Sequence, residues 1–205
     1  MKRTVYYVIV TLILTLIVAV LPVNGEETVY DEVIRLHVLA PSDSAEDQAL
    51  KLSVRDEILS VYGTRLAGAL DVTTAEEALL PLCEEIEATA EAVVKREGYA
   101  YTVKVEYGDE AYPTREYGDY TFPAGVYRSL RIVIGEGEGQ NWWCVLFPPL
   151  CLDIATDTAP SDDALSVGLG DGAETIVTGK EGDAGYLVRF KLLELLEGAL
   201  RNRGR

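Results

Sequence analysis

Alternation of apolar and polar residues predicts four β-strands. Residues 32–40 (EVIRLHVLA) present one well-buried face, and residues 99–107 (YAYTVKVEY) set tyrosine and valine against a polar face. Two further strands are expected at 126–134 and 141–147, and the glycine-rich segment 135–140 between them has the composition of a hairpin turn. The polar face of the second strand indicates antiparallel pairing.

Apolar residues spaced three and four apart predict three helices. The first covers residues 45–62, after N-cap candidates at 42–44. The second begins near Thr74 with a capping box and ends at Gly98, and Pro81 either kinks it or marks its true first turn. The third covers residues 186–200.

This order of elements predicts an α+β fold. We expect a mainly antiparallel sheet of about four strands, packed with the two helices of the N-terminal half and the C-terminal helix. Residues 153–185 are rich in Asp, Gly, Thr and Ala and predict a flexible acidic loop, with at most a short strand near 175–178. Residues 26–205 are expected to form one domain.

The N-terminal segment indicates export. Lys2 and Arg3 precede an uninterrupted apolar run at 5–21, and Gly25 offers a cleavage point. Residues 1–25 are therefore a signal peptide or an N-terminal membrane anchor, and both readings stay open. In either case residues 26–205 are expected to be extracytoplasmic.

Net charge limits the classes of partner, and the cysteine count bears on disulfide bonding. The formal net charge of −16 disfavours nucleic acid and anionic lipid headgroups as partners. The three cysteines are an odd number for an exported chain. A turn at Pro148 and Pro149 would bring Cys144 and Cys151 within bonding range, so a disulfide between them is one hypothesis, and Cys83 is expected to be a buried thiol.

No convincing catalytic set is present in the sequence. His37 is the only histidine, which rules out a site with several histidine ligands; its one catalytic reading is as a base for Cys144 in a secreted hydrolase. The glycines at 135–139 lack the spacing and the lysine of a phosphate loop. The acidic residues lack the spacing of an EF-hand. We therefore expect no enzyme activity, metal, cofactor or small-molecule substrate.

Three strings resemble a known family. They are RLHVLAPSDSAEDQALKLSVRD at 35–56, YGDYTFPAGVYRSLRIVIGEG at 117–137 and NWWCVLFPPLC at 141–151. Together they are similar to stage II sporulation protein R of spore-forming bacteria. The resemblance departs at Pro41, where the family usually has Asn, and at Glu138 and Gln140, where it usually has basic residues.

The resemblance implies a signalling role. Members of that family are exported from the forespore into the space between the forespore and mother-cell membranes. There they activate a membrane-embedded aspartic protease of the mother cell, which processes the precursor of the mother-cell sigma factor. A secreted hydrolase using Cys144 and His37, and a cell-wall or ligand-binding module, are the alternatives.

A partner surface is expected where the segment 136–143 meets the turn at 37–43. Trp142 and Trp143 are adjacent on a strand, so their side chains point to opposite faces, and one of them is a candidate contact. The expected partner-binding residues are His37, Asp43, Glu136, Glu138, Asn141, Trp142 and Trp143.

Overall fold

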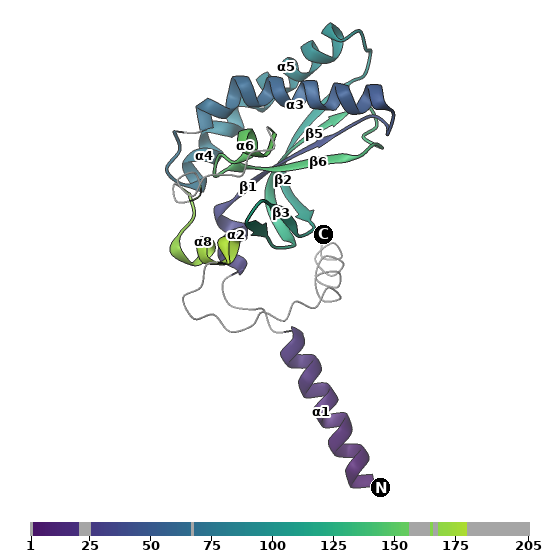
Figure 1. Ribbon diagram of the computed structural model, residues 1–205, viewed down its shortest axis with the longest axis vertical. Helices are drawn as coiled ribbons and strands as arrows, with labels where there is room; N and C mark the ends of the chain where they lie inside the picture. The colour runs from purple at the N-terminus through teal and green to yellow at the C-terminus, as the bar shows by residue number, and fades with distance from the viewer. Residues whose placement is uncertain (1, 21–25, 67, 156–164, 166–167, 180–205) are drawn as a thin grey trace.

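The computed structural model of the chain describes residues 2–20, 26–66, 68–155, 165 and 168–179. The fold is α+β, as the sequence predicts. A four-stranded sheet lies between a layer of helices and a mixed layer that contains a small second sheet (Figure 1).

The four-stranded sheet has the order β2-β5-β1-β6. Its strands are β1 (Ile34–Leu39), β2 (Val103–Tyr112), β5 (Gly125–Ile134) and β6 (Asn141–Phe147). The β2–β5 and β1–β6 pairs are antiparallel, whereas β1 and β5 run parallel. The predicted hairpin between β5 and β6 is therefore wrong, because β1 lies between them and residues 135–140 connect across its end. All six residues of β1 are buried, which suits an interior strand rather than an edge.

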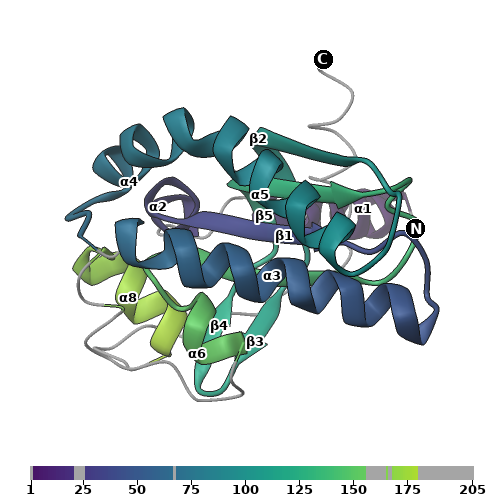
Figure 2. The ribbon, with the colours of Figure 1, turned by 90° about the horizontal axis from the view of Figure 1, so that it is seen from above.

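Three helical segments cover one face of the sheet (Figure 2). They are α3 (Ala45–Leu66), α4 (Val72–Leu79) and α5 (Cys83–Arg96). The single helix predicted over 74–98 is split by a 3-10 turn, Leu80–Leu82, which contains Pro81. Asp71 rather than Thr74 is the N-cap, and Thr74 completes the capping box. The sheet and these helices share a core that includes Leu36, Val38, Val54, Ile58, Ile86, Val94, Leu130 and Ile132.

The opposite face of the sheet is covered as well. It packs against α2 (Glu26–Glu32), the pair β3 (Arg115–Tyr117) and β4 (Tyr120–Phe122), and α8 (Asp171–Thr178). These elements build a second core from Val29, Val33, Tyr112, Phe122, Tyr127, Val145, Leu165 and Val177. The prediction of one buried face for β1 is therefore incomplete, because both of its faces are buried. The short strand expected near 175–178 is wrong, since those residues belong to helix α8.

Other predicted elements shift in position. The strand expected over 99–107 begins at Val103 and ends at Tyr112, and α6 (Cys151–Ala155) extends into the segment expected to be a loop. The predicted helix at 186–200 lies outside the described residues. Helix α1 (Lys2–Val20) points away from the rest of the fold (Figure 1). Among the described residues, no helix combines the length and apolar character needed to cross a membrane.

Candidate functional site

The connection at residues 135–140 is anchored to the turn that follows β1. The Gly139 amide donates to the Ala40 carbonyl at 2.9 Å, and the Gln140 amide donates to Oδ1 of Asp43 at 2.7 Å. A Cβ atom at Gly139 would lie 2.2 Å from the Ser42 carbonyl oxygen, so this close approach requires glycine. We call residues 135–140 and 40–44 together the loop–turn surface.

A buried lysine supports the loop–turn surface from below. Nζ of Lys51 donates to the Gln140 carbonyl at 2.9 Å and to Oε1 of Gln48 at 2.7 Å, and the residue is only 4% exposed. Burial and the nearby Arg55 lower the pKa of Lys51, and the charge of Asp43 partly opposes this shift. The loop is thus fixed by hydrogen bonds to both of its neighbours, the turn and helix α3.

The acidic residues of the loop point to solvent. Glu136 and Glu138 are exposed, while Gly135 and Gly137 adopt left-handed φ angles of 61° and 67°. Asp43, by contrast, is committed to the Gln140 amide. Of the expected partner-binding residues, the structure therefore brings Asp43, Glu136 and Glu138 together on one surface.

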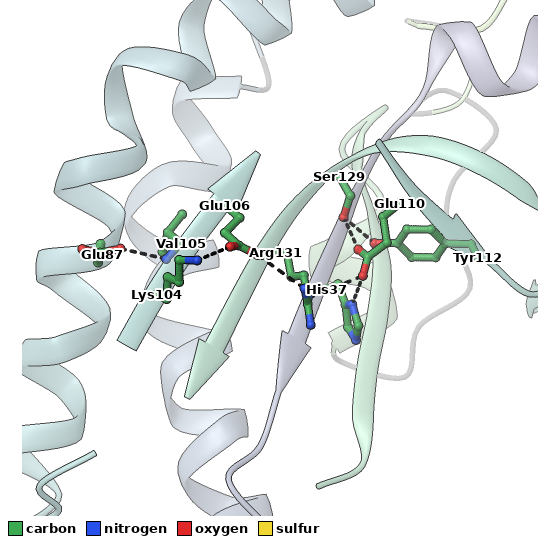
Figure 3. A network of polar contacts seen from close by, with 9 residues as sticks. All are labelled: His37, Glu87, Lys104, Val105, Glu106, Glu110, Tyr112, Ser129 and Arg131. Atoms are coloured by element: carbon green, nitrogen blue, oxygen red, sulfur yellow. Dashed lines mark hydrogen bonds and ion pairs between the residues drawn. The ribbon is translucent and has the colours of Figure 1, made fainter. Parts of the chain in front are cut away.

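His37 belongs to a buried polar network (Figure 3). Its Nδ1 donates to Oε1 of Glu110 at 2.8 Å. Its Nε2 lies 2.9 Å from Oδ1 of Asn141. The other Glu110 oxygen accepts from Ser129 at 2.8 Å, and Ser129 is also bonded to Tyr112 at 2.7 Å. With 6% exposure and both ring nitrogens engaged, His37 has a positioning role on β1 and offers little surface to a partner.

The network lowers the pKa of Glu110. Burial alone would raise it, but the hydrogen bond and charge of His37 and the hydrogen bond from Ser129 outweigh burial. Arg131 adds a cation 3.6 Å away and also pairs with Glu106 (Figure 3). Glu110 is therefore a carboxylate that ties β2 to β5 and β1.

The two tryptophans lie on opposite faces of β6, as predicted. Trp142 packs against the helix-side core, with the guanidinium of Arg55 4.7 Å from its ring centroid. Trp143 packs on the other core, where Arg115 stacks at 3.8 Å and the ring of His37 lies at 5.4 Å. Both indoles are half-buried and in contact with side chains of the chain itself.

Arg35 lies at the centre of an aromatic cage and is 0% exposed. Its guanidinium carbon is 4.5 Å from the ring of Tyr112 and between 5.2 and 5.8 Å from those of Tyr117, Phe122 and Tyr127. Nε donates to the Cys144 carbonyl at 3.1 Å and Nη2 to the Tyr117 hydroxyl at 2.9 Å. Within the described residues, no carboxylate pairs with Arg35, and its Nη1 has no hydrogen-bond partner.

A shallow groove of about 480 Å³ shares Tyr117 with this cage. It is lined by residues 115–117 of β3, by Gln140 and by residues 141–143 of β6, and we call it the arginine groove. Tyr117 connects the groove to the cage, because its hydroxyl accepts from Arg35 and donates to the Trp143 carbonyl at 3.0 Å. The groove adjoins the loop–turn surface through Gln140.

The cysteines do not support a hydrolase. Cys144 and Cys151 form a disulfide with their Cα atoms 5.3 Å apart, so Cys144 has no free thiolate. Cys144 also packs in the helix-side core, whereas His37 contacts Tyr112 and Trp143 on the other side of the sheet. Cys83 is free and half-buried, and burial raises the pKa of its thiol. Across the described part of the chain, no group of acidic, histidine or cysteine side chains has the arrangement of a metal site.

Sequence reasoning missed Arg35, Glu110 and Arg115 as parts of this site. The signal available for Arg35 was a charged residue in a six-residue strand whose one other polar residue is His37. Glu110 meets His37 across 73 positions of sequence, which no local pattern reveals.

Comparisons with known proteins agree with the resemblance of the three strings. The family described as stage II sporulation protein R matches residues 30–157. The stage II sporulation protein R of Bacillus subtilis (strain 168) is 37% identical over 137 residues, which cover 66% of this chain and 61% of the relative. The chain thus spans about three fifths of that relative's length. No solved structure matches. Because the family match covers more than half of the sequence, including every strand and helices α3 to α6, the chain belongs to the stage II sporulation protein R family.

Proposed function

We propose that this chain is an exported sporulation signal that activates a membrane-embedded aspartic protease of the mother cell. The protease then processes the precursor of the mother-cell sigma factor. Membership of the family supports a role in sporulation. The apolar segment after Lys2 and Arg3 supports export into the space between the two membranes, either as a cleaved signal or as an anchor.

The observation that carries this proposal is the loop–turn surface, whose backbone is hydrogen-bonded to the turn and to helix α3. It presents Glu136 and Glu138 to solvent while its backbone is held by Asp43 and Lys51. A preordered surface loses little conformational entropy when it binds a partner, which suits recognition. His37 is poorly placed to act as a general base, because both of its ring nitrogens are already bonded.

Activation by binding requires a difference in affinity between two states of the protease. A ligand moves a two-state equilibrium only by binding one state more tightly, and a nearly complete switch needs roughly 10⁴-fold preference. The loop–turn surface is expected to contact a basic or amide-rich region that is accessible only in the active state of the protease. No reaction at this chain's own residues is required.

Charge reversal on the loop tests the proposal. In sporulating cells, Glu136→Lys with Glu138→Lys is expected to abolish processing of the sigma precursor, measured by immunoblot. The matched control reverses Glu84 and Glu85, which are exposed at the start of α5, and should leave processing unchanged. Equal amounts of each variant outside the forespore cytoplasm must be shown by fractionation. Full processing of the sigma precursor with the loop variant would refute the loop–turn surface as the contact with the protease.

The gene itself provides the broader test. A strain that lacks this gene should accumulate unprocessed precursor, and the wild-type gene should restore processing. Normal processing in the deletion strain would refute the proposed function as a whole.

A further inference from the structure

The arginine groove contains an arginine, Arg115, that has no carboxylate partner among the described residues of this acidic protein. The chain has 34 acidic against 18 basic residues, so most cations have acidic neighbours within reach. Arg128, Arg131, Arg96 and Arg65 all pair with glutamates. Arg115 and Arg35 differ, because no carboxylate among the described residues lies at ion-pair distance from either of them.

Both unpaired arginines retain unused hydrogen-bonding capacity. Nε of Arg115 and Nη1 of Arg35 are buried and have no hydrogen-bond partner among the described residues. Buried polar groups are normally hydrogen-bonded, so two such atoms in connected residues need an explanation. Tyr117 makes the connection, since it is bonded to Arg35 and lines the same groove as Arg115.

The electrostatic environment of Arg115 agrees with a missing counter-charge. Burial and the nearby charge of Arg35 lower the pKa of Arg115, and the influence of Tyr117 opposes them only in part. An anion bound beside Arg115 would offset this repulsion and offer a hydrogen-bond acceptor to the Arg115 guanidinium. Glu116 is the acidic residue at the groove; it follows Arg115 on β3, so its side chain lies on the opposite face of that strand.

The tryptophans of the groove disfavour a sugar as its ligand. Sugars and choline-like cations bind to free faces of aromatic rings, but Arg115 stacks on Trp143 and Arg55 lies over Trp142. The stack instead holds the Arg115 guanidinium in a fixed plane, which favours recognition of a planar anion with two oxygens. The amides of Gln140 and Asn141 at the same rim can bond a peptide backbone.

We propose that the arginine groove binds an acidic side chain on an extended segment of a partner protein, with the carboxylate received by Arg115. This inference rests on the proposed function, because it assigns one contact to the same partner. The contact would lie beside the loop–turn surface, which recognises the partner through charge of the opposite sign. Two neighbouring sites of opposite charge fix the orientation of a partner, since the wrong orientation places like charges together.

The inference is tested first by titration of the purified full-length chain. The probes are overlapping peptides that cover the extracytoplasmic segments of the membrane protease proposed above. Each acidic peptide is matched by a version with glutamine or asparagine in place of its acidic residues. Sodium acetate serves as a free carboxylate. Because the chain has two tryptophans, the indole N–H signals of Trp142 and Trp143 give a direct NMR readout, assigned with Trp142→Phe.

We expect one acidic peptide to shift the Trp143 signal. Its amide version should bind at least about tenfold more weakly. Arg115→Gln should abolish the shift, whereas Arg96→Gln, a change at an exposed arginine paired with Glu57 on the helical layer, should leave it intact. Acetate should bind far more weakly than the peptide. Equal binding of acidic and amide peptides, no response from any peptide, or unchanged binding to Arg115→Gln would overturn the inference. A response to acetate as strong as to the peptide would also overturn it, because the groove would then be a site for free carboxylates.

The same variants in cells separate this inference from the proposed function. If the deletion strain fails to process the sigma precursor and Arg115→Gln also fails while being exported and folded, both statements are supported. If Arg115→Gln restores full processing to the deletion strain, the partner contact in the groove is refuted and the proposed function stands. If the deletion strain processes the precursor normally, the proposed function falls, and the groove contact falls with it.

Discussion

Replacing Glu110 by glutamine should destabilise the fold in a pH-dependent way. Glu110 accepts hydrogen bonds from His37 and Ser129, each at 2.8 Å, and its side chain is 22% exposed. Hydrogen bonds to a charged group contribute about 1.5–3 kcal/mol each when buried, and glutamine keeps one acceptor oxygen. We therefore expect Glu110→Gln to reduce the free energy of unfolding by about 2 kcal/mol at pH 7.

The pH dependence follows from the direction of the pKa shift. The pKa of Glu110 is lower in the folded protein than its ordinary value of about 4.3. A carboxyl group whose pKa is lowered by folding stabilises the fold above its unfolded pKa, and this contribution is lost as pH falls through the folded pKa. The difference between the wild-type protein and Glu110→Gln should therefore be constant from pH 7 to about 5 and shrink below about 4.

Urea denaturation followed by tryptophan fluorescence measures this difference at a series of pH values. Glu91→Gln is the matched control, because Glu91 forms an exposed pair with Lys95 at 3.0 Å and should change stability by less than about 0.5 kcal/mol. A loss for Glu110→Gln no larger than that of the control at pH 7 would refute the role of the network. A loss of the same size from pH 7 down to about 3 would refute its electrostatic origin.

Three further changes test the packing around the site. Removing the disulfide with Cys144→Ser and Cys151→Ser should lower the free energy of unfolding by about 2.5 kcal/mol by chain entropy, given the sequence separation of 7. Thiol titration of the denatured, unreduced wild-type protein should detect Cys83 alone. Gly139→Ala should cost about 1–3 kcal/mol through its clash with Ser42, whereas Gly108→Ala, with no atom within 4 Å of the new Cβ, should cost less than about 1 kcal/mol. Arg35→Met should reduce the free energy of unfolding by about 1–3 kcal/mol, because it leaves the Cys144 carbonyl and the Tyr117 hydroxyl without the hydrogen bonds that Arg35 donates. An unchanged melting temperature by circular dichroism would refute this role of Arg35.

The elements of this fold could be predicted from sequence more readily than their arrangement. The bounds of β6 agree with the predicted 141–147, and β5 begins one residue before the predicted 126. The order of strands could not be predicted, because turn composition at 135–140 fits a hairpin as well as a connection across β1. The deciding feature is the two-sided burial of β1, which depends on the second core built from distant segments.

The candidate site was likewise predictable from sequence only where local strand geometry decides the arrangement. The opposite faces of Trp142 and Trp143 follow from the two-residue period of a strand and were predictable. Arg35 was not, since a cation beside apolar residues in a strand usually marks a solvated face. Its burial becomes reasonable only once Tyr112, Tyr117, Phe122 and Tyr127 are known to surround it.

The three strings that resemble the family meet one another in space. Arg35 in the first string donates to the Tyr117 hydroxyl in the second and to the Cys144 carbonyl in the third. His37 faces Asn141, and Arg55 lies over Trp142, so the first and third strings also meet on both sides of the sheet. Residues that contact one another in this way restrict each other's identity, because a change in one leaves a buried polar or aromatic partner unsatisfied. The three strings therefore meet around β1 and β6, where the loop–turn surface and the arginine groove adjoin, while the outer helices α4 and α5 lie outside all three strings.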